Sequence, residues 1–424
     1  VQDAGGAVVD GLYIAGPVSA TIRAAEPDAV IHYTLNGAAP TQASAVYSGP
    51  IPVDRSLVLR AIAIRPGYMP SDPVGRTLLK EKPHTVPVVS LSGDPGGLVG
   101  SRGALTSAAS SKEIPVEFEF YETDGRLGID SEAGVELNGS FSRKEAQRSL
   151  ELKFRSAYGH SDITYPFFPG NDVSTFRRLI LRTSGQDWKW TKVRDAFMTR
   201  VMRGQMNLDT MAVRNCVVYV NGQYWGLYEI REKMDQHYVA SHYGVDPNNV
   251  DVVKGEGIGV AGNSKDMKAL IAYAKAHDMR DPVAYKYVTD RIDEESLMDF
   301  VIAYSFFNNT DSGNKKWWRV RSPDGQYRWM AFDFDWALYP STYKWNCLKG
   351  DMLNPGGHGV RDMFSTALQV RLMQNPAFRD KFIRRYAKHL NTTFETKRML
   401  GILDESVAIV EPDSGSTMAT LSSR

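Results

Sequence analysis

The chain has 424 residues, of which 42% are hydrophobic and 23% are charged. This length predicts two or more domains, and the composition is that of a folded globular chain, which excludes disordered, collagen-like and coiled-coil classes. The 50 Lys and Arg residues balance the 49 Asp and Glu residues to a formal net charge of +1, so no nucleic-acid partner is expected. No run of about 18 apolar residues occurs, and no membrane span is therefore expected.

Cysteine usage and the first residues bear on the compartment of the protein. Cys216 and Cys347 are too few for a disulfide scaffold or a Cys-rich zinc site, and the sequence leaves open whether they pair. The chain starts with Val-Gln-Asp rather than Met, which predicts a mature or trimmed form without its targeting segment.

The first 80 or so residues predict a small β-sandwich. Short alternating runs at 30–35 and 56–64 are separated by turns rich in Gly and Pro. The motif Tyr33-Thr34-Leu35-Asn36-Gly37 resembles the small β-sandwich domains found in chitobiases and other secreted carbohydrate-active proteins, although Asn36 stands where that family usually has Asp. The resemblance implies an accessory domain at 1–82, with carbohydrate as one candidate partner.

A linker at 80–84 precedes a region in which strands give way to helices. Alternation and turn residues predict strands at 86–92, 114–121, 132–138, 148–155, 176–183, 211–220, 224–230, 316–321 and 327–332. Helical spacing of apolar residues predicts helices at 191–203, 232–243, 264–277, 282–291, 295–307, 361–374, 376–390 and 396–410. The order predicts an α+β fold with a small strand-rich lobe followed by a helical one.

One arrangement in the second half predicts phosphoryl transfer. The apolar helix at 295–307 leads into a loop that carries Asp311 and Asn314, then into a tight hairpin, and then to Asp333. Transfer from a nucleoside triphosphate needs a metal that neutralises the phosphates and a carboxylate that orients the acceptor hydroxyl. Kinase-type folds supply a loop Asp, a loop Asn and a metal-binding Asp in this chain order.

Several separated motifs point to one family. They are Gln147-Arg148-Ser149, Val193-Arg194-Asp195-Ala196-Phe197, Asn221-Gly222-Gln223-Tyr224-Trp225-Gly226, Asp311-x-x-Asn314 and Phe332-Asp333-Phe334-Asp335. Together, and in this order, they resemble the CotH kinases, a family named after a spore-coat protein, over roughly residues 85–410. The resemblance implies an atypical protein-kinase-like, two-lobed domain at 83–424 that uses ATP and Mg²⁺ or Mn²⁺ on a protein substrate. It also implies an extracellular, cell-surface or spore-associated location.

The resemblance assigns catalytic and metal-binding roles by position. Asp311 and Asp333 are the expected catalytic carboxylates. Asn314, Asp333 and Asp335 are the expected metal ligands, because hard oxygen ligands suit Mg²⁺ or Mn²⁺. Asp333 and Asp335 are expected on one face of an extended strand, where side chains alternate with a period of two.

The expected nucleotide contacts are Arg148, Asp195, Glu232 and Asn314. Arg148 stands where the family commonly has Lys, and the two side chains are not interchangeable at a phosphate. Lys153 lies on the opposite face of the same predicted strand and cannot simply replace it. Two alternatives to an active kinase therefore stay open: a catalytically degenerate kinase-like adhesin, and an envelope-associated or carbohydrate-binding structural protein.

Overall fold

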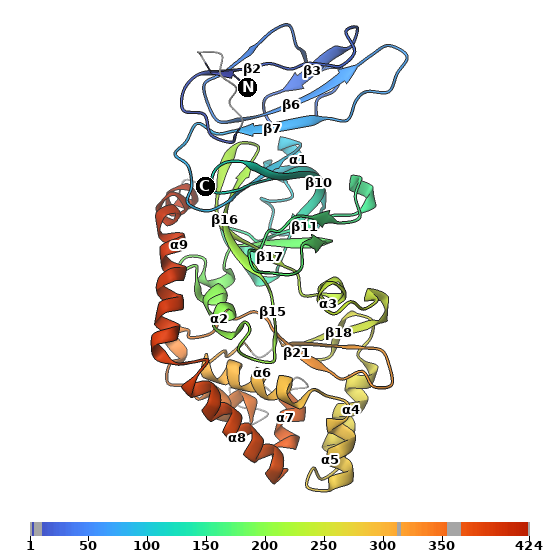
Figure 1. Cartoon of the computed structure of the whole chain (residues 1–424), viewed down its shortest axis with the longest axis vertical. Helices are drawn as coiled ribbons and strands as arrows, with labels where there is room; N and C mark the ends of the chain where they lie inside the picture. Colours follow the sequence, from blue (N-terminus) through green and yellow to red (C-terminus); the bar gives the residue numbers. More distant parts are fainter. Residues whose placement is uncertain (1, 4–10, 312–314, 354–365, 423–424) are drawn as a thin grey trace. The chain divides into compact units, whose positions relative to one another are not determined.

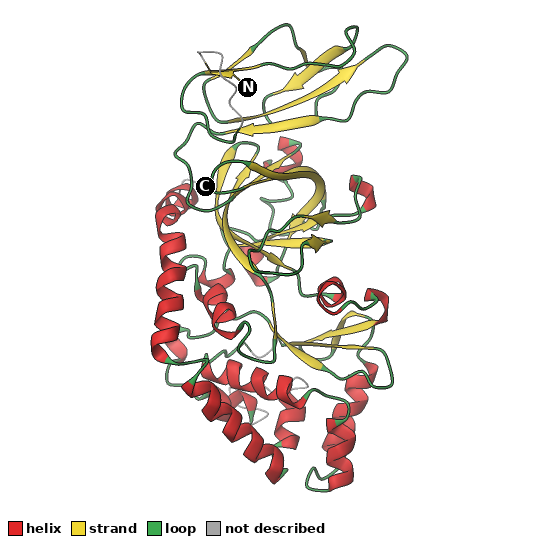
Figure 2. Cartoon of the chain, viewed as in Figure 1, coloured by secondary structure: helices red, strands yellow, loops and turns green. Residues whose placement is uncertain are grey.

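The computed structural model describes residues 2–3, 11–311, 315–353 and 366–422. Their contacts divide the chain into two compact units (Figure 1). Unit 1 comprises Val1–Thr183, Val213–Arg231 and Ile409–Arg424, and unit 2 comprises Ser184–Ala212 and Glu232–Ala408. Strands dominate unit 1, whereas unit 2 combines a sheet with most of the helices (Figure 2), so the α+β class is confirmed.

The N-terminal part of unit 1 is all-β, as predicted, and forms two antiparallel sheets. Their strand orders are β1-β2-β5 and β4-β3-β6-β7. The strands are β1 (Gln2–Asp3), β2 (Val18–Ala20), β3 (Val30–Thr34), β4 (Ala45–Val46), β5 (Ile51–Val53), β6 (Leu57–Ile64) and β7 (Val74–Leu78). Val18 and Ile51 from one sheet and Leu57 and Leu59 from the other are buried in one core, because alternate side chains of each strand face inward.

The rest of unit 1 is built around a closed barrel with the strand order β10-β11-β14-β17-β16-β8-β9. Its strands are β8 (Val88–Ser92), β9 (Ile114–Tyr121), β10 (Leu127–Leu137), β11 (Leu150–Lys153), β14 (Arg178–Arg182), β16 (Val213–Val220) and β17 (Gln223–Glu232). The accompanying short elements are α1 (Pro95–Val99), β12 (Ile163–Thr164) and β13 (Thr175–Phe176). Phe118, Phe120 and Phe154 are fully buried and make edge-on ring contacts with neighbouring aromatic residues, which is how bulky rings fill a small barrel.

Two glycine turns bring the sandwich and the barrel into close contact within unit 1. A Cβ at Gly37 would lie 2.2 Å from Asn221 Oδ1, and one at Gly222 would lie 3.1 Å from the backbone of Leu57. Both glycines have left-handed φ angles, +80° and +77°. The Asn-Gly turn of the sandwich and the Asn-Gly turn between β16 and β17 therefore both need glycine, for conformation and for space.

Buried polar groups also join the sandwich to the barrel. Arg60 on β6 pairs with Glu117 on β9 at 2.7 Å, and both side chains are buried. On β9 Glu119 accepts hydrogen bonds from the Thr77 and Tyr121 hydroxyls. Burial raises the pKa of Glu117 to about 7, against the opposing effect of the Arg60 charge. The sandwich is thus part of the folded body of unit 1 rather than a loosely tethered module.

The sheet of unit 2 has the strand order β15-β21-β20-β18-β19. Its strands are β15 (Asp209–Thr210), β18 (Val250–Lys254), β19 (Ile258–Ala261), β20 (Lys316–Val320) and β21 (Arg328–Ala331). The helices are α2 (Arg194–Met202), α3 (Gln236–Tyr243), α4 (Lys265–Ala276), α5 (Pro282–Thr289), α6 (Glu294–Phe306), α7 (Ala367–Leu372) and α8 (Pro376–Asn391). Helix α9 (Thr396–Ser422) begins in unit 2, and its residues from Ile409 on belong to unit 1. The apolar helix α6 is buried at the centre of this unit, with Phe300, Ile302 and Tyr304 fully buried.

Several predicted boundaries need correction. Glu232 ends strand β17 and does not begin a helix, because Asp235 caps α3 by accepting the N–H groups of His237 and Tyr238. Strands β18 and β19 were not predicted. Helix α9 continues past residue 410 and through Pro412 to Ser422.

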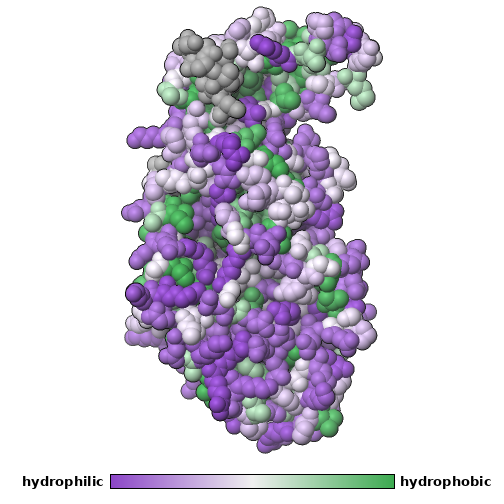
Figure 3. All heavy atoms as spheres, in the orientation of Figure 1, coloured by the Kyte–Doolittle hydropathy of each residue, from purple (hydrophilic) through white to green (hydrophobic). Residues whose placement is uncertain are grey.

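Cys216 and Cys347 both occupy buried positions. None of the helices in the described ranges is both long and apolar enough to cross a membrane. The face shown in Figure 3 is mostly hydrophilic, with hydrophobic residues in small scattered patches.

Candidate functional site

Three of the predicted site residues lie close enough to Tyr304 in unit 2 for their charges to act on its hydroxyl. Tyr304 is fully buried near the end of α6, and its hydroxyl donates to the carbonyl of Phe332 at 2.6 Å. Burial raises the pKa of Tyr304 well above its ordinary value, and the negative charges of Asp333, Asp311 and Asp195 raise it further. The loop after α6, the segment after β21 and the start of α2 therefore bring these three carboxylates to one place.

Asn309 joins the two loops that carry Asp311 and Asp333. Its side chain is 1% exposed. Nδ2 donates to the carbonyl of Asp333 at 3.1 Å, and Oδ1 accepts the N–H of Asp311 at 3.1 Å. The sequence analysis missed Asn309, although its place in an Asn-Asn-Thr-Asp run after an apolar helix is a usable signal, since Asn commonly binds nearby backbone groups.

The segment around Asp333 is a turn, so the expectation of an extended strand was wrong. Strand β21 ends at Ala331, and Asp333 has a left-handed φ of 63°. The next N–H, from Phe334, donates to Asp195 Oδ1 at 3.0 Å. Asp333 stays partly exposed, whereas Asp335 is buried and its Oδ2 accepts the N–H of Gln186 at 2.9 Å. The turn thus separates the environments of the two carboxylates.

Backbone strain in the described residues is concentrated in unit 2. The non-glycine residues with left-handed φ angles are Ser184, Lys192, Asn308, Asp333 and Leu338 in unit 2 and Asn221 in unit 1. Such conformations cost about 1 kcal/mol or more each and persist where the surroundings enforce them, which is common at functional sites. Their concentration near the carboxylates marks this region independently of any motif.

A second set of contacts, made by Arg194 of α2, holds the turn that contains Asp333 and Asp335. Arg194 donates to the carbonyl of Asp335 at 3.1 Å and pairs with Asp187 at 3.3 Å. Asp187 is fully buried and also accepts N–H groups of Thr191 and Arg194. Predicted residue Asp195 and its neighbour Arg194 therefore hold the same turn through separate contacts.

The other predicted nucleotide contacts lie elsewhere. Both carboxylate oxygens of Glu232 are engaged within unit 2, one by the N–H of Ala212 and one by His242 Nε2, each at 2.7 Å. Arg148 belongs to unit 1, where its guanidinium donates to the carbonyl of Arg143 at 2.6 Å and to that of Leu105 at 3.5 Å. Asn314 lies outside the described residues.

A buried lysine that the sequence analysis did not single out also lies in this region of unit 2. Lys316 Nζ donates to the carbonyl of Met234 at 2.9 Å and lies 3.9 Å from the centre of the Phe332 ring. Burial lowers the pKa of Lys316 to about 7. The alternating pattern of strand β20 did not mark Lys316 as functional. Only the tertiary fold places it beside Phe332, in the segment that leads to Asp333.

Few side chains near Tyr304 could bind a divalent metal ion. Within the described ranges, no group of three or more His, Cys, Asp or Glu side chains is arranged to hold a metal ion. Asp311 and Asp333 are both partly exposed carboxylates in the same cluster. Mg²⁺ is usually held by one or two carboxylates together with waters and substrate phosphates, so this donor set fits that ion and not a closed structural zinc site.

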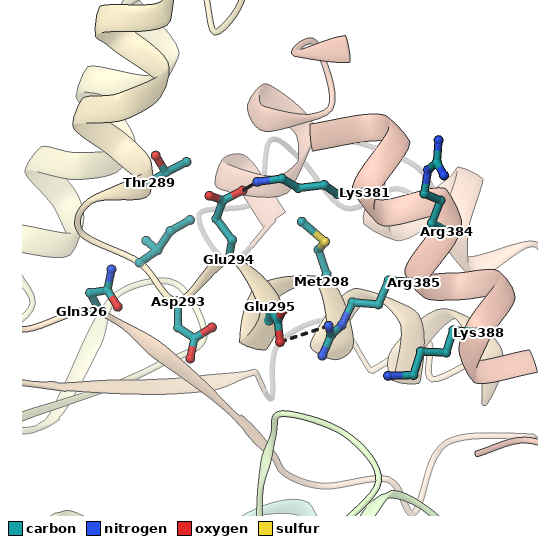
Figure 4. Close-up of a pocket in the computed structure, with 11 residues that line it drawn as sticks. Thr289, Asp293, Glu294, Glu295, Met298, Gln326, Lys381, Arg384, Arg385 and Lys388 are labelled. Carbon is teal, nitrogen blue, oxygen red and sulfur yellow. Dashed lines mark hydrogen bonds and ion pairs between the residues drawn. The ribbon is translucent and has the colours of Figure 1, made fainter. Parts of the chain in front are cut away.

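A pocket of about 540 Å³ in unit 2 contains none of the predicted site residues (Figure 4). It lies where the start of α6 faces α8. Lys381 pairs with Glu294 at 3.5 Å and Arg385 with Glu295 at 3.1 Å across it. The three carboxylates in its lining, Asp293, Glu294 and Glu295, are each paired with a cation, unlike a cluster of like charges.

Comparison with known families decides the relationship. The family described as CotH kinase protein matches residues 135–418. The chain belongs to the CotH kinase family. All seven predicted site residues, from Arg148 to Asp335, lie within the CotH match.

The N-terminal region matches a second family. The chitobiase/beta-hexosaminidase C-terminal domain matches residues 9–75, as the Tyr33–Gly37 motif predicted. No curated protein matches the CotH chain closely enough to serve as a relative. Membership of the CotH family suggests an atypical kinase that uses ATP and a divalent metal.

Proposed function

We propose that this CotH family member is an atypical protein kinase that transfers the γ-phosphoryl group of ATP to a hydroxyl of a protein substrate. The observation that supports this most is the cluster of Asp311, Asp333 and Asp195 around Tyr304, held by Asn309 and by the left-handed turn at Asp333. Asp311 and Asp333 are partly exposed, and the buried amide of Asn309 is hydrogen-bonded to the backbone of both. This arrangement suits phosphoryl transfer, which depends on positioning and on charge.

In this proposal each carboxylate has a separate task. Asp311 orients the acceptor hydroxyl and takes its proton as the oxygen attacks the γ-phosphorus and the bond to the ADP oxygen breaks. Asp333 and Asn314 would bind Mg²⁺ or Mn²⁺, which would neutralise phosphate charge. Asp335 stays the third predicted ligand, although its buried environment differs from that of Asp333. Asp195 keeps the Phe334 N–H in place and so fixes Asp333.

The nucleotide contacts and the organisation of the chain complete the proposal. The nucleotide contacts Arg148, Asp195, Glu232 and Asn314 stay predictions, because each of the first three already has hydrogen-bond partners within its own unit. The two contact units would correspond to the two lobes of a kinase-like fold. The domain boundaries would be 1–82 for the sandwich and 83–424 for the kinase-like domain. The protein would act outside the cell or on its surface or spore envelope, with carbohydrate as a candidate ligand of the sandwich.

Intact-mass measurement after incubation with ATP and Mg²⁺ or Mn²⁺ tests the proposal. We expect the parent protein to gain phosphate units, or to phosphorylate added protein acceptors, and Asp333→Asn to do neither. Asn is the best replacement because it tolerates the left-handed φ of 63°. Asp324→Asn, in the exposed hairpin turn, is the matched control and should retain activity. Gain of a nucleotide monophosphate instead would keep the site and change the reaction.

One observation favours a second candidate function, a kinase-like binding protein without catalysis. The guanidinium of Arg148 donates to backbone carbonyls of unit 1, as a structural arginine would. If ATP with Mg²⁺ or Mn²⁺ neither changed the mass of any protein nor raised the melting temperature, the binding protein would replace the kinase.

A further inference from the structure

Two lysine side chains lie on one face of the unit 2 sheet, next to the segment that leads to Asp333. Lys254 on β18 and Lys316 on β20 are directly opposite each other in the antiparallel pairing of these strands, so both point to the same face. Their ammonium groups lie 5.3 Å and 3.9 Å from the centre of the Phe332 ring. Because Phe332 immediately precedes Asp333, these two residues, the lysine pair, lie beside the proposed metal carboxylate.

The lysine pair uses few of its hydrogen-bond donors within the protein. The ammonium group of Lys316 donates to the carbonyl of Met234 at 2.9 Å, which occupies one of its three N–H groups. Within the described ranges, the ammonium group of Lys254 makes no hydrogen bond or ion pair and contacts the face of the Phe332 ring. An aromatic ring attracts a cation but does not neutralise it. Most N–H groups of the pair are therefore available to an acceptor.

The positive charge of the pair has no direct carboxylate partner. Burial lowers the pKa of Lys316 to about 7, the charges of Lys254 and Lys233 lower it further, and those of Asp235 and Asp333 act in the opposite direction. Among the described residues, neither of these carboxylates is hydrogen-bonded or ion-paired to Lys316. Like charges directly opposite each other on paired strands destabilise a sheet. The arrangement therefore lowers stability unless an anion offsets the repulsion.

A ligand from solvent can reach this place. Lys254, Phe332 and Asp333 are all partly exposed, whereas Lys316 is buried at 6% exposure. Arg148, the expected phosphate contact, differs from the lysine pair because its guanidinium already donates to two backbone carbonyls. The lysine pair thus has more free donors than Arg148 has, and it lies next to a proposed metal ligand.

We propose that the lysine pair binds a phosphate group beside Asp333, which in the proposed reaction is a phosphate of ATP. Two ammonium groups match a phosphate dianion, whereas a neutral ligand would leave their repulsion in place and a single carboxylate would balance only one of them. Lys binds phosphate as a compact point charge, which suits a site next to a metal-binding carboxylate. The inference deepens the proposed kinase function, on which the choice of ATP as the source of phosphate rests.

Calorimetric titration of the full chain with inorganic tripolyphosphate and, separately, with ATP and Mg²⁺ tests the proposal. We expect both ligands to bind and to compete with each other. Lys254→Met removes the charge and keeps the length of the side chain, so it should weaken both affinities by about tenfold or more, as the loss of a charge-assisted contact does. Lys254→Arg keeps the charge and should recover most of this loss.

Further variants test whether the effect belongs to the pair. Lys316→Met should weaken binding as Lys254→Met does, and if urea unfolding shows that it does not fold, Lys254→Met alone decides. Lys268→Met removes an exposed lysine of α4 in the same unit and should leave both affinities as in the parent. Lys254→Met relieves the repulsion between two cations and should not destabilise the ligand-free protein. A Lys254→Met protein that is destabilised and binds both ligands normally would overturn the proposal.

Failure of the phosphate site and failure of the kinase give different results. If a phosphoryl group is transferred and the KM for ATP is unchanged in Lys254→Met, the phosphate site is overturned and the kinase is spared. If none is transferred but tripolyphosphate binding depends on Lys254, the phosphate site is supported and the kinase is not. Binding of a phosphoserine peptide but not of ATP, with the same dependence on Lys254, supports the site and assigns it to a phosphorylated protein. A parent protein that binds none of the three ligands overturns it.

Discussion

Unit 1 and unit 2 bury charged groups in different ways. In unit 1 Arg60 with Glu117, and Glu119 with Thr77, form closed pairs that join the sandwich to the barrel. In unit 2 several carboxylates converge on Tyr304, and Asp311 and Asp333 among them remain partly exposed. Closed pairs are typical of structural packing, whereas accessible like charges held together by other contacts are typical of a site that binds cations or phosphates.

Backbone strain follows the same division. Among the described non-glycine residues, left-handed φ angles occur at one position in unit 1, Asn221, and at several in unit 2. Asn221 sits in a hairpin turn that requires such angles, while Asp333 is one of the clustered carboxylates and Asn308 precedes the loop of Asp311. Buried charge alone therefore does not distinguish the two units, but buried charge combined with strain and access does.

The largest expected effect comes from Asp195, which accepts the Phe334 N–H and so holds the turn at Asp333. Asp195→Ala removes the acceptor of the Phe334 N–H, which should shift Asp333 and lower the phosphoryl-transfer rate by about 10³-fold, or about 4 kcal/mol. Asp195→Asn keeps an oxygen acceptor and should recover most of this loss. Rates of ADP formation, measured beside urea unfolding of both variants, check the prediction. Equal losses in the two variants would contradict a positioning role.

The next-largest expected effect is the dependence of stability on pH that Glu117 in unit 1 causes. Glu117 has a pKa of about 7 in the folded protein against 4.5 in the unfolded chain, so the folded state binds the extra proton and stability falls as pH rises from about 4.5 to 7. The difference corresponds to about 3 kcal/mol. Glu117→Gln should remove this part of the pH dependence, measured by urea unfolding across that range. The exposed Glu26→Gln, in the same unit, should keep the parent slope, and an unchanged slope in Glu117→Gln would contradict the assignment.

A smaller effect tests the contact between sandwich and barrel. Gly222→Ala introduces both a strained left-handed alanine and a Cβ 3.1 Å from the Leu57 backbone, whereas Gly67→Ala introduces the same strain in open space. Left-handed alanine costs about 1–2 kcal/mol, and the contact should add about 1 kcal/mol at Gly222 only. Urea unfolding of both variants measures the difference. Equal losses of stability in the two variants would show that Gly222 makes no close contact with the Leu57 backbone.

The smallest effect is expected at Arg148. Arg148→Lys retains the charge but cannot donate to the carbonyls of Arg143 and Leu105 as the planar guanidinium does, so stability should fall by about 1 kcal/mol. ADP formation should change less than about fivefold. A large gain in rate would instead show that Arg148 had silenced the parent enzyme.

Local patterns predicted much of the fold because their causes are local. Strand β9 and the start of helix α8 follow the predicted ranges closely, since alternation fits the barrel wall and Asn375 with Pro376 starts the helix. The strand predicted from 148 begins only at Leu150, and β18 was missed, because a short apolar run fits either state until a neighbouring strand pairs with it.

The sequence by itself determined the family, the N-terminal sandwich, the order of the elements and the candidate residues Asp311 and Asp333, because these follow from residue types at short spacing. Only the tertiary structure decided that Asp333 occupies a left-handed turn, that Asn309 joins the loops of Asp311 and Asp333 and that Glu232 ends a strand. Each of these positions has a hydrogen bond to a residue 20 or more positions away: Phe334 to Asp195, Asn309 to Asp333, and Ala212 to Glu232. Such bonds leave no periodic trace in the sequence, because the energy that fixes each residue comes from a partner many positions away.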